Sequence, residues 1–540
     1  MTDRQRQHLH REIAARLEKT GAARDPDRHA VIGYHWSSAG DAGKAIGYLS
    51  SASDHSGLSQ SYYEQAELLR QAMRLDATLP QPAGPQIRGQ WETRIARAFF
   101  QLGHVSASVK HGERAVSALV APMPGKAAVI PRLFQEIWRV KTGRPGPTPT
   151  SEEERDTLLS AAQTCIEISF HTYEMGKLPL SMFVTFLAVN LARRAGKPSV
   201  PLAIGNANIA IASLSLPFLF DGRKFRQEAI EIAEAVGDPV GLYWIGVTAS
   251  THAFATGQLD IAIALADRAI QMGRDHLQAR DFEAASSHKA NFMRAGGYFA
   301  EGFALDSQTL VSGRDRGAIQ GRIWGLNGCC RSALAMGETE ALLAHTNELE
   351  ALLSDPGNAS DLSVNNSIAL LVSRAQLALV EGKPEVAGPH LDAAASILAA
   401  VSGPQYYLEE VPGNLGDALL RCWQLDPGYT VLSIARKVLK CAHLIARTYP
   451  IAAYRPHLAR GDLALYQGKP ERARAHWQKA REAACASGFP FSEAHTEMRL
   501  ALYSDAAHER VDTLFAQIGV PVPSHWCTLL ADKRLGRALP

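Results

Sequence analysis

Small residues recur along the chain with the period of an α-helix, and no stretch alternates apolar and polar positions as a strand would. In LYQGKPERARAHWQKA (465–480), Ala473 and Ala480 stand five and twelve positions after Gly468. Seven residues bring a helix back to nearly the same face, so both alanines fall on one stripe. The pattern predicts an all-α chain in which two amphipathic helices pack closely on either side of each turn.

The spacing of one glycine and two alanines recurs along the sequence. Full copies follow three other glycines: Gly40 with Ala45 and Ala52, Gly257 with Ala262 and Ala269, and Gly382 with Ala387 and Ala394. Partial copies follow three more: Gly103 with Ser108 and Ala115, Gly176 with Ser181 and Ala188, and Gly337 with Leu342 and Leu349. Between Gly257 and Gly468, the turns near 297, 337, 382 and 427 lie 40 to 45 residues apart. A fixed period of this size predicts a solenoid of stacked helix pairs.

The turn residues support the same interpretation. Glycine ends the first helix of each pair, where a left-handed backbone is favoured. Pro384 and Pro470 follow their turns by two residues and suit the first turn of the next helix, because proline lacks only an N–H that is unused there. Gly222 does not fit the spacing, since Ala229 and Ala233 stand off register.

This pattern resembles the tetratricopeptide repeat (TPR), in which small residues follow a glycine at the same distances. A further glycine seven positions before the turn, as Gly33 before Gly40 and Gly461 before Gly468, is also similar to that family. The repeats here are longer than the family's unit, and the proline that closes each unit is mostly missing. The resemblance implies a right-handed superhelical solenoid of antiparallel helix pairs, whose concave surface binds a protein or peptide.

Two segments resemble one particular group of helical-repeat proteins more closely. GYHWSSAGDAGKAIGYLSSASDHSGLSQSYYEQAELLRQAMRL (33–75) and HLARGDLALYQGKPERARAHWQKAREAACASG (457–488) resemble the carboxy-terminal regions of large bacterial multidomain ATPases. Those ATPases are often joined to nucleotide cyclase or LuxR-type regulator domains. RQRQHLHREIAARLE (4–18) resembles the helix that leaves the ATPase portion. The resemblance implies the regulatory half of such a protein.

Breaks in the helical pattern divide the chain into four parts. Residues 1–141 hold an N-terminal helix and the first repeats, and the proline-rich stretch 142–150 reads as a linker. Ser151 and Glu154 then predict a capping box for the next helix. The main solenoid is expected over 151–518, followed by a tail over 519–540 that covers the end of the array.

Composition narrows the class of protein. With 540 residues the chain is too long for one core, and its 56 basic and 54 acidic side chains leave a formal charge of only +2. This balance gives no strong positive electrostatic field that would attract a nucleic acid. The sequence also indicates no apolar stretch long enough to span a membrane and no signal peptide. The seven cysteines, scattered apart from Cys329 and Cys330, predict buried, reduced thiols in a cytoplasmic protein.

A search for catalytic motifs finds none. The segment GRPGPTPTS has glycines and hydroxyls but lacks the lysine of a phosphate-binding loop, so the ATPase activity of the resembling proteins is not carried over. His8 and His10 point to opposite sides of a helix, and His171 with Glu174 is interpreted as a solvated pair rather than as half of a metal site. Trp36 and Trp477 are predicted to be core anchors. We expect no enzyme activity, cofactor or metal.

The remaining candidate is the concave groove. In a TPR array the first helix of each pair lines this groove, and its outward positions can be counted back from the turn glycine. That count selects polar and aromatic residues as partner-binding candidates: Trp244, Thr251, Asn291, Arg294, Trp324, Asn327, Arg331, Gln376, Arg455, Asp462 and Tyr466. Arginine and tryptophan on one face suit a peptide, because they supply carboxylate contacts and apolar anchors.

Three functional hypotheses follow. The first is a non-catalytic helical-repeat scaffold or sensor arm in cytoplasmic signalling, which binds a protein or peptide through the groove. The second is a detached regulatory portion of a cyclase-linked or transcription-regulator ATPase, which would depend on a separate motor chain. The third is an enzyme with an unrecognised site between helices.

Overall fold

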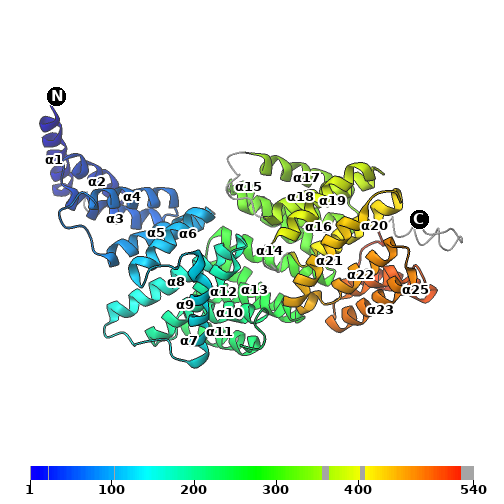
Figure 1. The fold of residues 1–540 in the computed structure, drawn as a ribbon. Helices are drawn as coiled ribbons and strands as arrows, with labels where there is room; N and C mark the ends of the chain where they lie inside the picture. The colour runs from blue at the N-terminus through cyan, green and yellow to red at the C-terminus, as the bar shows by residue number, and fades with distance from the viewer. Residues whose placement is uncertain (1, 22–23, 103, 356–363, 402–407, 524–540) are drawn as a thin grey trace. The chain divides into compact units, whose positions relative to one another are not determined.

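The computed structural model describes residues 2–21, 24–102, 104–355, 364–401 and 408–523. Within these ranges the chain is helical and contains no strand, so the predicted all-α class is confirmed (Figure 1). The helices form two compact units, Met1–Gly205 and Asn206–Pro540. No helix in the described ranges is long and apolar enough to cross a bilayer.

The first unit is a stack in which neighbouring helices pack as pairs. Its helices are α1 (Asp3–Lys19), α2 (His29–Ser38), α3 (Ala42–Leu58), α4 (Tyr62–Asp76), α5 (Pro85–Leu102), α6 (Val105–Leu119), α7 (Val129–Thr142), α8 (Glu152–Glu174) and α9 (Leu178–Ala195). Each of α1 to α5 contacts the helix that follows it. α8 packs against α5, α6 and α9, and α7 packs against α9. The proline-rich stretch 142–150 joins α7 to α8 inside this unit.

The second unit is likewise built of packed helices. α10 (Val200–Ser213) runs across the boundary between the units along the chain. The others are α11 (Gly222–Val236), α12 (Pro239–Ala255), α13 (Leu259–His276), α14 (Ala279–Gly296), α15 (Phe299–Asp315), α16 (Ile319–Met336), α17 (Thr339–Ser354), α18 (Val364–Val380), α19 (Pro384–Ala400), α20 (Val411–Leu425), α21 (Val431–Thr448), α22 (Arg455–Tyr466), α23 (Pro470–Ser487), α24 (Pro490–Leu500) and α25 (Asp505–Ile518).

Alternate helices of the second unit form one layer. α12, α14, α16, α18 and α20 each contact the next even-numbered helix, in addition to their neighbours in sequence. α24 also contacts α14, so the last even-numbered helix returns to the start of the unit. We call α12 to α24, taken by even numbers, the even layer.

The predicted stripes of small residues lie at the contacts between helices. All eight alanines of the four full copies are at most 3% exposed. Ala269 of α13 shows why they are small: a β-carbon on Gly246 of α12 would come within 2.7 Å of the Ala269 β-carbon. The partners of the partial copies are buried as well, although Gly103 itself lies outside the described residues.

The turn chemistry is also as predicted. Gly257 and Gly468 have φ of 82° and 67°, in the left-handed region where a side chain would be strained. Pro384 and Pro470 are the first residues of α19 and α23. Gly222 is the first residue of α11 rather than part of a turn before it, which explains why its spacing is off register.

One local prediction needs correction. The Ser151 hydroxyl accepts from the Glu154 N–H at 3.1 Å, as a cap requires. The Glu154 carboxylate, however, accepts from the Thr150 N–H at 2.9 Å instead of from Ser151, so the capping box is displaced by one residue. Of the predicted tail, residues 524–540 lie outside the described residues, and α25 ends at Ile518.

Overpacking one stripe tests the role of the small residues. Replacement of Ala269 by leucine is expected to reduce the free energy of unfolding by roughly 1–3 kcal/mol, because the side chain faces α12 without space. Ala264→Leu on the exposed side of the same helix serves as the matched control. Urea denaturation followed by circular dichroism measures both; equal midpoints for the two variants would contradict the interpretation.

Candidate functional site

The eleven predicted groove residues all lie on the even layer, on α12, α14, α16, α18 and α22. Their expected outward placement is wrong for most of them. Thr251, Arg294, Asn327, Gln376, Arg455 and Asp462 are at most 6% exposed. Trp244, Asn291, Trp324, Arg331 and Tyr466 are only partly exposed. Their contact with a partner remains a prediction, but the open groove that motivated it is not found at the buried positions.

The physical reason is that the second unit covers this face with its own last helices. Phe489, just before α24, packs edge-on against Phe254 of α12, with ring centroids 6.0 Å apart. Phe491 of α24 packs in the same way on Phe299, at 4.7 Å. Together with the contact between α24 and α14, these rings bring the end of the unit onto its beginning. The sequence count treated the array as open and therefore assigned these faces to solvent.

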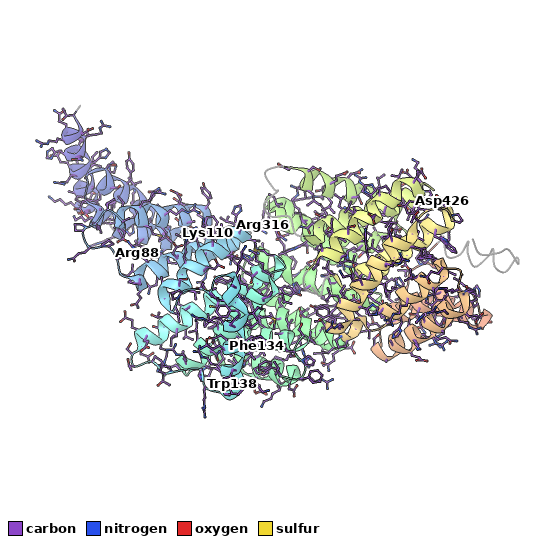
Figure 2. All side chains as sticks on the ribbon, in the orientation of Figure 1. Arg88, Lys110, Phe134, Trp138, Arg316 and Asp426 are labelled. Atoms are coloured by element: carbon purple, nitrogen blue, oxygen red, sulfur yellow. The ribbon has the colours of Figure 1, made fainter. Side chains whose placement is uncertain are left out.

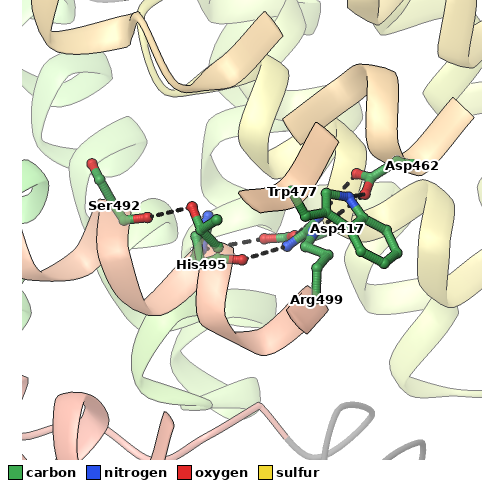
Figure 3. Close-up of polar contacts among 7 residues, drawn as sticks. Asp417, Asp462, Trp477, Ser492, His495 and Arg499 are labelled. Carbon is green, nitrogen blue, oxygen red and sulfur yellow. Dashed lines mark hydrogen bonds and ion pairs between the residues drawn. The ribbon is translucent and has the colours of Figure 1, made fainter. Parts of the chain in front are cut away.

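Arg499 of α24 is the centre of the covered face (Figure 3). Its guanidinium lies 2.6 Å from the Asp417 carboxylate of α20 and 3.1 Å from that of Asp462 of α22. The Trp477 indole N–H also donates to Asp462, at 3.0 Å. Burial opposes the charge on Arg499, but the carboxylates of Asp462 and Asp417 outweigh it and raise the pKa of Arg499. One arginine thus joins three helices of the even layer.

His495 lies beside this cluster, one turn before Arg499. Its Nε2 is 3.3 Å from the second oxygen of Asp417. Burial lowers the pKa of His495 from 6.5 to about 4, although the nearby Asp417 charge acts in the opposite direction. The imidazole is therefore neutral at pH 7. The same burial lowers the pKa values of His252 and His288 to about 4.

The other buried candidates are also held by partners from the same chain. Arg455 donates to Glu409 at 2.6 Å, and Asn327 donates to Asn366 at 2.9 Å. Arg331 pairs with Glu410, and Arg294 pairs with Asp306. Burial raises the pKa of Asp306 to about 6, despite the facing Arg294 charge.

Little space remains on the covered face. Arg455, Asp462 and Tyr466 line a cavity of about 10 Å³, which is about the volume that one water molecule requires. These side chains therefore join helices to one another and leave no space here for a peptide. Their partners come from helices distant in sequence, which single-position counting along one helix cannot detect.

An open hollow lies in the first unit, where sequence reasoning selected no residue. It measures about 870 Å³ and is lined by α3, α5 and α8, with one residue of α6. Ile87 is 47% exposed there, and the partly buried Ile46 and the buried Trp91 add apolar surface. The outward positions predicted from the sequence were counted back from Gly257 and from later turn glycines only. The same count from the turn glycines of the amino-terminal repeats would have selected residues on these helices.

Charged groups of both signs surround the apolar residues of the hollow. Arg94 donates to the Ser50 carbonyl at 3.0 Å and pairs with Asp54. Arg97 lies 3.1 Å from Glu167, yet half of its side chain is exposed. Asp156 on α8 is exposed. The hollow therefore offers hydrogen-bond donors and acceptors next to apolar anchors, which are the groups that extended peptides use.

A second hollow, of about 590 Å³, lies in the second unit beside the segment between α10 and α11. Phe218 at its rim is 97% exposed, and Arg223 and Arg447 line it with His252. Asp221 in the same wall already accepts from the first N–H groups of α11, so the helix end is capped by the chain itself.

The described ranges contain no cluster of three or more histidine, cysteine or acidic residues arranged for a metal ion. His8 lies 3.3 Å from Glu12, whereas His10 contacts His35 at 2.9 Å. His171 is fully buried and stacks on Phe100 at 4.6 Å, so its interpretation as a solvated group is wrong. The side chain of Glu174 lies outside the described residues.

The remaining sequence predictions concern tryptophans and cysteines. Trp36 and Trp477 are at most 4% exposed, which confirms them as core anchors. Cys329 and Cys330 are buried free thiols, and burial raises their pKa values to about 12 and about 11. Cys485 is an exception to the predicted burial, since it is exposed.

Comparisons with known proteins add little to this geometry. No protein-family model matches the chain, and neither does any curated protein sequence. A Signal Transduction ATPase with Numerous Domains (STAND) with a tetratricopeptide repeat sensor, from Pyrococcus horikoshii, matches at 13% identity and a TM-score of 0.28, over 74% of this chain and 53% of that one. A circular tandem repeat protein matches at 14% identity and a TM-score of 0.14, over 95% and 98%.

This chain thus spans about half of the length of the STAND protein. At these TM-scores neither match carries an argument about function. The helical-repeat assignment rests on the helices of the chain itself.

The two carboxylates around Arg499 generate a prediction. Arg499→Ala is expected to reduce the free energy of unfolding by roughly 3–5 kcal/mol, because it removes the cation that faces the buried carboxylate of Asp462 and the largely buried carboxylate of Asp417. Arg268→Ala, which removes a surface pair with Glu234, is expected to cost less than about 1 kcal/mol. Urea denaturation of both variants tests the contrast; a comparable loss in each would contradict it.

A second prediction concerns pH. The unfolded chain binds protons at the three buried histidines below pH 6.5, whereas the fold does so only near pH 4. These histidines therefore lower the free energy of unfolding as pH falls from 6.5 to 4, and they have no such effect above pH 6.5. Asp306 acts oppositely, because its raised pKa stabilises the fold as pH falls below about 6. Among the described residues, seven histidines and three carboxyls with lowered pKa values outnumber five carboxyls with raised ones, which predicts a net loss of stability on acidification.

The share of one histidine can be measured. His495→Gln removes one titrating group, so the loss of unfolding free energy between about pH 7.5 and about pH 5 should shrink by on the order of 1–2 kcal/mol. Urea denaturation at the two pH values gives this difference for wild type and variant. An unchanged difference would show that His495 does not hold its neutral form in the fold.

Proposed function

We propose that this chain is a non-catalytic helical-repeat scaffold that binds a protein or peptide partner through the open hollow of the first unit. The observation that carries the proposal is the contrast between the predicted groove face of the second unit and the hollow of the first unit. In the second unit, charged side chains of the even layer pair with one another and leave a cavity of about 10 Å³. In the first unit, α3, α5 and α8 leave about 870 Å³ open.

The chemistry of the hollow supports a peptide as its ligand. Ile87 offers an exposed apolar anchor at the start of α5. Arg97, on the same helix, is half exposed and offers hydrogen-bond donors to a carboxylate of the ligand. Gln86 donates to Glu153 at 3.0 Å, which holds α5 to α8 and fixes the width between them. An extended segment would lie across α3, α5 and α8, with apolar side chains toward Ile87 and acidic ones toward Arg97.

We propose further that the chain acts in cytoplasmic signalling, as a scaffold or sensor arm. The thiols of Cys329 and Cys330, kept protonated by burial, suit a reducing compartment. The alternative of a detached regulatory portion of a cyclase-linked or transcription-regulator ATPase rests on the sequence resemblance alone, and no feature of the described structure favours it separately.

A pair of charge substitutions in the hollow tests the proposal. Ile87→Glu with Gln90→Glu replaces two exposed side chains of α5 that line the hollow, so the fold should be retained while peptide binding is lost at least about tenfold. Immobilised wild type and variant are compared for partners captured from lysate of the source cell, and the captured partner's affinity is then measured with purified protein.

The matched control is Leu58→Glu, which adds a charge at an 84% exposed residue of α3 that does not line the hollow. Circular dichroism confirms equal helicity in all three proteins. A partner that binds wild type and the control but not the hollow variant supports the proposal. Equal binding to all three proteins would remove the hollow as the binding surface.

A further inference from the structure

Helix α7 of the first unit has apolar side chains on two adjacent faces. Leu133, Ile137 and Val140 are buried, and α7 packs on α9. On the adjacent face, Ile130, Phe134 and Trp138 are 46%, 62% and 67% exposed. Figure 2 labels Phe134 and Trp138 on this helix. These three residues stand at every fourth position, so they form one ridge about 12 Å long. We call them the α7 ridge.

The charge around the α7 ridge has one sign. Residues 121–150 contain five cations, Lys126, Arg132, Arg139, Lys141 and Arg144, and one acid, Glu136. Glu136 is buried, and it is held by Arg139 at 2.6 Å and by the Asn190 amide at 2.8 Å. Lys126, Arg132, Lys141 and Arg144 are exposed. The ridge is thus flanked by positive charge that no exposed acid of its own segment neutralises.

Other cations lie at the same end of the helix. Arg193, in the last turn of α9, donates to the Val140 carbonyl at 3.1 Å. Arg194 donates to the Pro147 carbonyl at 3.0 Å, next to the end of α7. The carboxyl-terminal end of α7, which carries Trp138, therefore holds several arginines and lysines, although the whole chain has a formal charge of only +2.

We propose that the α7 ridge is a docking surface for an acidic amphipathic helix of a partner protein. A single ridge of side chains four residues apart fits the groove between the side-chain rows of another helix. Large aromatic groups at the centre of such a contact supply most of the binding energy, and the surrounding cations select a partner rich in Asp and Glu. This second surface extends the proposed function but does not depend on the hollow.

Charge argues against the other occupants. A second copy of this chain docking through the same face would bring two segments together that each carry five cations and one acid. Residues 524–540 of this chain carry three cations and one acid and would be repelled as well. An anionic membrane would match the charge, but it favours a wide apolar face, whereas here the adjacent apolar face of α7 is already packed in the unit and only the ridge remains exposed.

A synthetic helix tests this docking directly. The probe is a fluorescently labelled peptide of about 18 residues with leucine at helical spacing on one face and Glu and Ala elsewhere. Full-length wild type is expected to bind it with a Kd below about 100 µM, and binding should weaken at least about threefold as salt rises from about 50 to about 200 mM. A peptide with lysine in place of every glutamate should bind at least about tenfold more weakly.

Two variants separate the ridge from its charge. Phe134→Ala with Trp138→Ala removes the exposed rings, and Lys141→Glu with Arg144→Glu reverses two exposed cations; each is expected to weaken binding at least about tenfold. Circular dichroism and the urea midpoint confirm that both remain folded. The hollow variant Ile87→Glu with Gln90→Glu should bind the probe like wild type, so failure of the hollow proposal would leave this result unaffected.

Three outcomes would overturn the docking proposal. These are no saturable binding of the acidic peptide, equal binding by wild type and the Phe134→Ala, Trp138→Ala protein, and equal binding of the acidic and basic peptides. Co-sedimentation with phosphatidylserine-containing vesicles gives a fourth: vesicle binding that needs Trp138, without peptide binding, would assign the ridge to a lipid surface instead.

Discussion

The architecture depends on how closely the two helices of each pair can approach. An isolated helix pair leaves an apolar face exposed, so each pair must be covered by the next, and the stack is stable only as an array. One close approach is at Gly246 of α12 and Ala269 of α13, where an added β-carbon on Gly246 would come within 2.7 Å of the Ala269 β-carbon. Alanine therefore recurs at the same two positions after the turn, because a larger side chain would separate the helices and shift every later pair.

In the second unit this close packing places charged groups out of water. Arg499 is fully buried between Asp417 and Asp462, and Arg455 is buried against Glu409. Buried ion pairs recover little net free energy, since desolvation costs about as much as the attraction returns. Their effect is geometric instead: a shifted helix would leave a charge unpaired, so the pairs favour one register between α20, α22 and α24.

Both proposed binding surfaces lie in the first unit. The hollow between α3, α5 and α8 has charges of both signs, whereas the α7 ridge combines two exposed aromatic rings with cations alone. Surfaces with such different charge select different ligands. The scaffold interpretation thus needs no catalytic group, because recognition follows from which helix faces remain uncovered after the repeats have stacked.

The amino-acid sequence by itself determined the helical class, the turn positions and the contact stripes. These depend on interactions within about twelve residues, so glycine and alanine spacing such as Gly468, Ala473 and Ala480 predicts them. Only the tertiary structure decided which faces are open. Arg294 and Arg331 were predicted as groove residues from a count along one helix, but they pair with Asp306 on the following helix and with Glu410 just before α20. Burial depends on contacts between different helices, some of them far apart in sequence, and the spacing along one helix carries no information about them.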